Sequence, residues 1–157
     1  MKVEYINPFL KAIFGVLGVL SSDCPERGTL SMRSVDKTKH QVTIVLDVSG
    51  DITGKVLYGM SGVTAQKVAY AMLDQPLGEM NEAAWDAIQE LGNVLKTGAL
   101  RHLQSEDVKC DIAEPTMIRG MDIEVSTEFA SIVVPVSSRL GRVEVNISVQ
   151  APVATKA

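Results

Sequence analysis

A long amphipathic segment over residues 81–103 constrains the fold more than any other part of this chain. Side chains three and four residues apart lie on one face of a helix, and two such series run through the segment. The polar series comprises Asp86, Glu90, Asn93 and Thr97, and the apolar series comprises Ala84, Ile88, Leu91 and Leu95. At about 100° per residue, the mean directions of the two series differ by roughly 200°. The segment therefore predicts a helix that buries one side and holds a carboxylate and a carboxamide toward solvent.

Two further helices are predicted before it. Residues 8–20 are expected to be helical because Asn7 can cap their start and Pro8 fits the first turn, where a missing N–H costs nothing. Ser61 is a suitable cap for a second helix that ends at residue 73. In the long helix, Gly98 lies on the buried side by phase, which predicts close packing against a neighbouring element.

Alternating apolar and polar residues predict the strands. They cover residues 26–34, 41–48, 52–60, 109–118, 121–126, 129–136 and 142–149. The last strand has the cleanest pattern, with its core side formed by Val143, Val145, Ile147 and Val149. Its outer side is expected to carry Arg142, Glu144, Asn146 and Ser148.

The order of these elements is a helix, three strands, two helices and then three or four strands. This order is typical of an α+β fold with helices packed on a mostly antiparallel sheet, and it contains a rough internal repeat of helix then strands. With 157 residues, of which 46 % are hydrophobic, the chain is long enough for a sizeable core. We expect a single domain over residues 1–151 and a flexible tail over residues 152–157.

Charge and hydropathy argue against two classes of partner. A net charge of −4 and a pI near 5.2 disfavour nucleic acid, which needs a basic surface to replace its counterions. The apolar run over residues 12–20 is far shorter than the roughly 20 residues that a membrane span requires, and no export signal is recognisable. We therefore expect a core helix in a cytoplasmic protein that binds neither a membrane nor nucleic acid.

The cysteines and histidines do not form a recognisable site. Cys24 and Cys110 are far apart and in no C-x-x-C pattern, which is typical of free cytosolic thiols. His40 and His102 are isolated from other ligand-type residues, so the sequence predicts no metal site.

By itself, an exposed glutamate and asparagine on a helix are typical of an ordinary solvated face. Asn93, however, is a weaker helix former than Gln, Glu or Lys, and it follows Gly92. Such violations of local preference concentrate at functional sites. Glu90 and Asn93 therefore form the candidate site, with plain surface as the alternative.

The spacing Asp86-x-x-x-Glu90-x-x-Asn93 resembles the signature of the CheC/CheX chemotaxis phosphatases, and the CheX branch most closely. Residues 3–9, 61–73 and 114–120 and the closing hairpin also match. Members of this family remove phosphate from an aspartyl-phosphate on a response regulator. The resemblance implies a pseudo-twofold arrangement of long helices on the sheet, and a phosphorylated CheY-like response regulator as partner.

The resemblance also implies residue roles. The catalytic residues would be Glu90, which pairs with a lysine in the regulator's active site, and Asn93, which orients the attacking water. Asp86 would flank or orient Glu90, with an ordinary exposed carboxylate as the alternative. Thr97 stands where family members usually carry glycine, on the partner-binding face, where it would crowd the partner or bond to the amide. The magnesium would belong to the regulator, so no cofactor is expected in this chain.

Three functions follow: an aspartyl-phosphate phosphatase, a non-catalytic binding module for the phosphorylated regulator, and a structural homodimer with an ordinary polar surface. Thr97 is the evidence for the second. Glu4 and Asn7 repeat the Glu–Asn spacing, but Pro8 biases Asn7 away from helical geometry, so we expect one site. A one-site chain resembles the CheX branch, which implies a homodimer formed through sheet edges.

Overall fold

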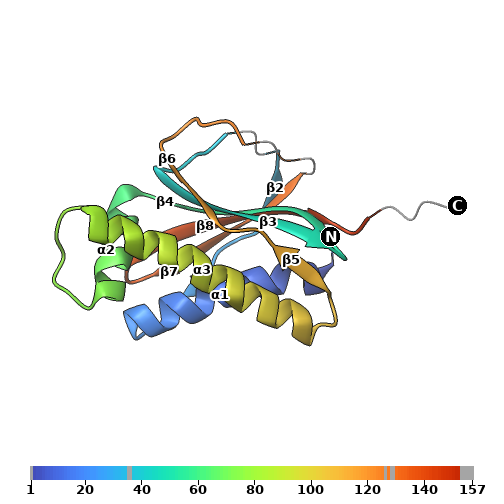
Figure 1. The fold of residues 1–157 in the computed structure, drawn as a ribbon, viewed down its shortest axis with the longest axis horizontal. Coiled ribbons are helices and arrows are strands. Elements are labelled where there is room, and N and C mark those ends of the chain that lie inside the picture. Colours follow the sequence, from blue (N-terminus) through green and yellow to red (C-terminus); the bar gives the residue numbers. More distant parts are fainter. Residues whose placement is uncertain (1, 35–36, 126, 128–129, 153–157) are drawn as a thin grey trace, which may run out of the picture.

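Helices α1 and α3 lie side by side on one face of an antiparallel sheet, and α2 lies at one end of this pair (Figure 1). The computed structural model describes residues 2–34, 37–125, 127 and 130–152. Its elements are α1 (Val3–Ser21), β1 (Glu26–Arg27), β2 (Ser31–Arg33), β3 (Val42–Gly50), β4 (Thr53–Met60), α2 (Gly62–Leu73), α3 (Glu82–Ser105), β5 (Cys110–Ile112), β6 (Thr116–Arg119), β7 (Ser131–Ser138) and β8 (Gly141–Gln150). The α+β class is confirmed.

The sheet joins two halves of the chain that exchange strands. Its order is β1-β7-β8-β4-β3-β5, and the hairpins β3–β4 and β7–β8 meet where Tyr58 pairs with Val145. Strands β1 and β2 of the first half pair with β7 of the second half, and strands β5 and β6 of the second half pair with β3 of the first half. This mutual exchange is the pseudo-twofold arrangement that the resemblance implied.

The core lies between the sheet and the α1–α3 pair. The predicted inner residues of β8 are buried, as are alternate residues of β3. A Cβ atom built on Gly98 would lie 3.3 Å from the Cβ of Ala12, so the expected close packing at Gly98 joins α3 to α1. The hydroxyl of Tyr58 donates to the carbonyl oxygen of Phe9 at 2.8 Å, which ties α1 to β4, and burial raises the pKa of this tyrosine.

The predicted start of α1 is wrong. The helix begins at Val3, and its first turn has no side-chain cap, so Asn7 is a helical residue and not the cap. Pro8 lies inside the helix and removes one backbone hydrogen bond, at a cost of about 3 kcal/mol. Burial of Ile6 and Phe9 on either side offsets this cost, because each buried apolar side chain contributes about 1.5–3 kcal/mol.

Helix α1 is also the one helix in the described part of the chain that could cross a membrane by length and composition. Its mean hydropathy is 1.4, and 39 % of the apolar window is buried inside the protein. The buried side, from Ile6 to Leu17, belongs to the main hydrophobic cluster. The expectation of a core helix is therefore confirmed, while the cytoplasmic location stays a prediction.

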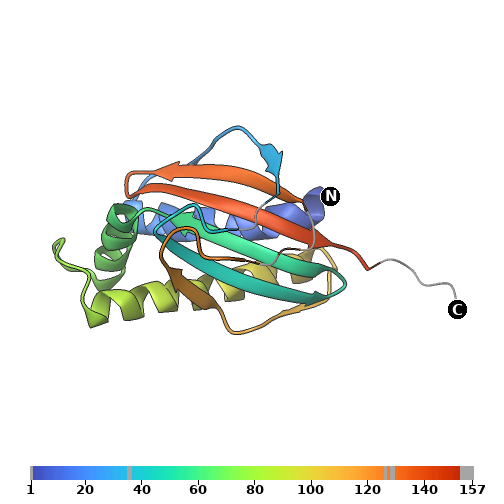
Figure 2. The same ribbon diagram turned by 90° about the horizontal axis from the view of Figure 1, so that it is seen from above.

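The outer face of β8 differs from the prediction. Glu144, Asn146 and Ser148 are buried and not exposed, and residues 37–41 and 120–125 lie over this face of the sheet (Figure 2). Glu144 accepts a hydrogen bond from the Arg33 guanidinium, and its Oε2 lies 3.5 Å from Nε2 of His40. The His40 ring, with the charge of Arg33, holds the pKa of the Glu144 carboxyl below its ordinary value, although burial opposes this shift.

Three predicted strands are shorter than expected. The strands predicted over residues 26–34 and 109–118 each split into two, namely β1 with β2 and β5 with β6. Over residues 121–125, only Glu124 makes an isolated bridge, to Lys37, because Asp122 adopts a left-handed backbone with φ of 59°. Ser126, the start of the strand predicted at residue 129, and the tail from residue 153 lie outside the described residues.

Candidate functional site

The ends of α3 are well defined. At its start, Oδ1 of Asn81 accepts a hydrogen bond of 2.9 Å from the backbone N–H of Ala84, which satisfies one of the free donors of the first turn. Glu82 in the first turn and His102 in the last turn complement the helix dipole. The cap and these charges favour the same helix limits that the amphipathic pattern predicted.

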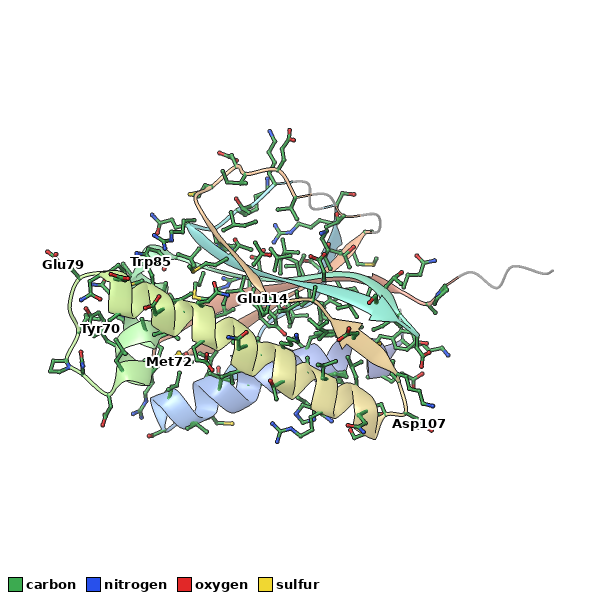
Figure 3. All side chains as sticks on the ribbon, viewed as in Figure 1. Tyr70, Met72, Glu79, Trp85, Asp107 and Glu114 are labelled. Carbon is green, nitrogen blue, oxygen red and sulfur yellow. The ribbon has the colours of Figure 1, made fainter. Side chains whose placement is uncertain are left out.

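Contacts with the β5–β6 region fix how α3 is rotated about its own axis. Nε2 of Gln89 donates to the carbonyl oxygen of Pro115 at 3.2 Å, and a Cβ on Gly92 would lie only 2.9 Å from the Cβ of this proline. Trp85 lies near the start of α3 (Figure 3). The Arg119 guanidinium lies 3.9 Å from the centroid of its ring. With α1 on the opposite flank, these contacts leave one side of α3 facing outward.

The outward side of α3 carries all four residues singled out from the sequence. Asp86, Glu90 and Thr97 are exposed, and Asn93 is half-buried. Nδ2 of Asn93 donates to Oε2 of Glu90 at 3.3 Å, so these two side chains are in direct contact.

This pair has the chemistry to hold a cation and a water molecule. The Glu90 carboxylate can accept hydrogen bonds from an ammonium group. The carboxamide of Asn93 has two N–H groups and an oxygen acceptor, so its bond to Glu90 leaves capacity for a water. A donor and an acceptor on one anchored side chain can fix the direction in which that water points.

Charge changes sign along α3 at this pair. The exposed acids Glu82, Asp86 and Glu90 precede Asn93, and the bases Lys96 and Arg101 follow it. A partner that covers the centre of α3 would therefore meet a negative surface on one side and a positive surface on the other.

Sequence reasoning missed two residues that position the site. Gln89 and Pro115 hold α3 on its strand side, yet neither belongs to the polar series. The available signal was Gly92: a glycine inside a helix costs about 1 kcal/mol relative to alanine, which indicates that another part of the chain approaches closely. Which segment approaches was not readable from the sequence.

Other candidate chemistry is sparse in the described residues. There, no group of three or more His, Cys, Asp or Glu side chains could hold a metal ion, and the expectation of no cofactor stays a prediction. Cys24 and Cys110 are free, and burial raises the pKa of the Cys110 thiol, which reduces its thiolate fraction.

Two halves that exchange strands in one sheet, covered by a pair of long helices, form an α+β fold that this chain shares with solved CheC-like proteins. Solved structures share this fold. A chemotaxis protein CheX from Desulfovibrio desulfuricans has a TM-score of 0.80 at 22 % identity, with 96 % of this chain and 100 % of that chain covered. The CheX–CheY–BeF3–Mg complex from Borrelia burgdorferi has a TM-score of 0.76 at 24 % identity, with 95 % and 99 % covered.

Sequence comparison identifies the family. The family model described as chemotaxis phosphatase CheX matches residues 42–137, more than half of the chain, so this chain belongs to the CheX family. The CheY-P phosphatase CheX of Thermotoga maritima is 26 % identical over 138 residues, which cover 87 % of this chain and 89 % of that protein. The resemblance drawn from the signature is therefore confirmed.

Proposed function

We propose that this chain is a phosphatase that hydrolyses the aspartyl-phosphate of a CheY-like response regulator. The observation that carries the proposal is the Glu90–Asn93 pair, in mutual contact on the outward side of a rigidly held helix. Membership of the CheX family and the likeness to a CheY-P phosphatase support the same activity. The CheX–CheY complex supports the choice of partner, because that neighbour binds a CheY protein.

In this proposal Glu90 docks the enzyme on its partner. Its carboxylate pairs with a lysine in the regulator's active site and brings the neighbouring amide over the phosphoryl group. An ion pair across an interface contributes to recognition and orientation as well as to affinity. Asp86, one helical turn earlier, flanks Glu90 and adds negative charge toward the same lysine.

Asn93 then positions the nucleophile. Its carboxamide holds one water in line with the bond between phosphorus and the aspartyl oxygen. The water oxygen attacks phosphorus, that bond breaks, and inorganic phosphate and a free aspartate result. Catalysis of this kind depends on positioning and electrostatics, as is usual for phosphoryl transfer. Magnesium held by the regulator would neutralise charge on the phosphoryl oxygens, and this chain would supply the docking carboxylate and the positioned water.

A second candidate function is a binding module that captures the phosphorylated regulator without hydrolysing it. Thr97 favours this alternative, because its branched side chain is exposed one turn after Asn93, where the family usually has glycine. A larger side chain there would keep the amide from reaching full depth in the partner's cleft. Docking through Glu90 would persist.

The test is the rate of phosphate loss from a phosphorylated receiver domain, measured with and without this protein. We expect wild type to accelerate the loss and Asn93→Ala to abolish the acceleration with the fold intact. Gln104→Ala is the matched control, since Gln104 is exposed further along α3. Equal rates for wild type and Asn93→Ala would contradict the assignment of Asn93.

A binding measurement separates the alternatives. Retention of the beryllofluoride-activated regulator without any acceleration of phosphate loss would favour the binding module. Equal retention of activated and unactivated regulator would contradict both functions.

A further inference from the structure

A hollow of about 460 Å³ lies between α1 and α3, and one of its ends reaches α2. Apart from Lys11, Arg101 and His102, its lining residues are small or apolar, and they include Gly15, Val19, Met72, Val94 and Gly98. Met72 belongs to α2 and lies where that helix approaches the α1–α3 pair (Figure 3). We refer to this hollow as the α1–α3 groove.

The lining of the groove exposes apolar surface. Val19 is 79 % exposed and Val94 is 40 % exposed, and both line the groove. A Cβ atom on Gly15 would meet nothing within 4 Å, so the groove is open at this point and has room for a side chain from outside. Exposed apolar side chains gathered at an open hollow can pack against an apolar side chain of a partner.

Positive charge borders the groove. Lys11, Arg101 and His102 line it, and no aspartate or glutamate does. The whole chain, by contrast, carries a net charge of −4. A local excess of basic side chains on an acidic protein favours a partner whose facing surface is negative.

The groove continues directly from the candidate site. Val94 and Gly98 follow Asn93 and Thr97 in sequence, and one residue along a helix corresponds to a rotation of about 100°. The groove therefore forms the α1-side flank of the outward side of α3. A protein domain whose cleft receives Asn93 would also cover the groove.

We propose that the α1–α3 groove is a second docking surface for the receiver domain of the phosphorylated regulator. In this proposal the groove accepts an apolar side chain of the receiver domain, one that lies beside the carboxylates at the rim of the receiver's phosphorylation cleft. This rests on the proposed function, which supplies the partner. A receiver cleft that holds a phosphoryl group and carboxylates bound to magnesium is negative, and Lys11 and Arg101 complement that charge. Glu90 pairs with the regulator's lysine while the groove binds the adjacent apolar surface.

Two exposed substitutions test the groove without disturbing the core. Val19→Glu replaces the most exposed apolar side chain of the groove by a negative charge, which would repel the negative surface of the partner. Gly15→Leu fills the open space in the groove with a side chain. Val63→Glu is the matched control, because Val63 is a helical valine that is 60 % exposed and lies on α2 outside the groove. The probes are the receiver domain activated with beryllofluoride and magnesium, for the dissociation constant, and the phosphorylated receiver domain, for turnover.

We expect Val19→Glu and Gly15→Leu each to weaken binding about tenfold or more, as for residues at the centre of an interface. Turnover at saturating regulator should equal that of wild type, and Val63→Glu should bind as wild type does. Val19→Glu introduces a charge and Gly15→Leu fills space, so if one variant fails to fold, the other still tests the groove. Unchanged dissociation constants for the folded groove variants would overturn the proposal.

Two further outcomes separate this proposal from the proposed activity. If wild type hydrolyses no aspartyl-phosphate but the groove variants still weaken binding, the phosphatase assignment fails and the docking surface stands. If the groove variants leave regulator binding unchanged and instead shift the oligomeric state measured by light scattering, the groove joins two copies of this chain. That result would overturn the assignment to the regulator.

Discussion

Helices α1 and α3 hold equivalent places in the two halves of the molecule, and both carry a glutamate and an asparagine three residues apart. When α1 is aligned with α3 so that Asn7 matches Asn93, Glu4 matches Glu90. Five pairs of buried residues then coincide: Ile6 with Gly92, Phe9 with Leu95, Ala12 with Gly98, Ile13 with Ala99 and Leu17 with Leu103. The Glu–Asn spacing is thus repeated by the fold itself, and the surroundings of each pair must decide which one acts.

The surroundings differ most in charge. Glu4 borders a hollow that is also lined by Asp51, Glu106 and Asp107. The Glu90–Asn93 pair has acids only on its N-terminal side along α3, and the bases Lys96 and Arg101 follow it. A cluster of carboxylates repels a partner that carries a phosphoryl group, so the α1 pair is unsuited to such a partner. Glu–Asn spacing on a helix is therefore insufficient to make a site, because the charges around the pair also select the partner.

The two pairs also differ in how firmly they are held. The α3 pair lies in the middle of its helix, beside the contact between Gln89 and Pro115. The α1 pair lies in the uncapped first turns, where Glu4 makes an exposed ion pair with Lys2, at 3.8 Å between Nζ and Oε1. A group that positions a nucleophile must be fixed closely, which favours α3.

The largest expected effect compares the two asparagines. We expect Asn93→Ala to reduce the catalysed rate of aspartyl-phosphate loss by about 100-fold or more, in line with the removal of one preorganised hydrogen-bonding group from an active site. Asn7→Ala should leave the rate unchanged. Steady-state phosphate release measures both variants. An equal loss of rate in both variants would show that the two asparagines contribute alike, which would contradict the assignment of catalysis to α3.

The next effect compares two glycines of the paired helices. We expect Gly98→Val to lower the free energy of unfolding by about 1–3 kcal/mol, because the side chain would overpack against Ala12. Gly15→Ala should raise it by about 0.5–1 kcal/mol, since alanine favours a helix and the space around Gly15 is open. Urea denaturation measures both, and a stabilised Gly98→Val variant would contradict close packing at the helix crossing.

The glutamates should differ in substrate binding. Glu90→Lys is expected to raise KM for the phosphorylated regulator about tenfold or more, because the charge would then repel the regulator's lysine. Glu4→Lys should change KM little, although it reverses the same charge on the equivalent helix. Saturation kinetics at low and high salt measure the effect. A similar rise in KM for both variants would assign docking to overall charge and not to α3.

The smallest expected effect concerns the pH dependence of stability on the outer face of the sheet. There the first half buries the apolar residues Val45 and Leu57, and the second half buries Glu144. The pKa of Glu144 is lower in the folded state than in the unfolded state. The ionised carboxylate therefore stabilises the fold fully above the unfolded pKa of about 4.3. This stabilisation is lost as the pH falls through the folded-state pKa. We expect Glu144→Gln to be less stable than wild type at neutral pH and to lose less stability in acid. Thermal unfolding across pH measures this, and parallel curves would contradict it.

Much of this architecture was predictable because its signals are local. The two faces of α3 and the inner residues of β8 follow from periodicity alone, and Ser61 and Asn81 mark helix starts through their capping hydrogen bonds. These features depend on residues a few positions apart, which a sequence displays directly. The outward position of Glu90 follows from the same periodicity.

The features that the sequence did not predict depend on contacts between distant segments. Helix α1 extends through Pro8 because Ile6 is buried, and that burial exists only once the core has formed. Glu144 is buried because Arg33 and His40 arrive from another part of the chain. The α1–α3 groove likewise requires both helices in place, so neither sequence segment indicates it alone.

The proposed function requires that α3 holds the Asn93 amide outward, where it can enter the active site of a phosphorylated receiver domain. The most direct measurement is the side-chain amide NMR signal of Asn93 as the beryllofluoride-activated regulator is added. We expect this signal to shift or broaden with the activated regulator and not with the unactivated one, while the signal of Asn7 stays in place. A bound regulator that leaves the Asn93 signal unchanged, or that moves the Asn7 signal instead, would contradict it.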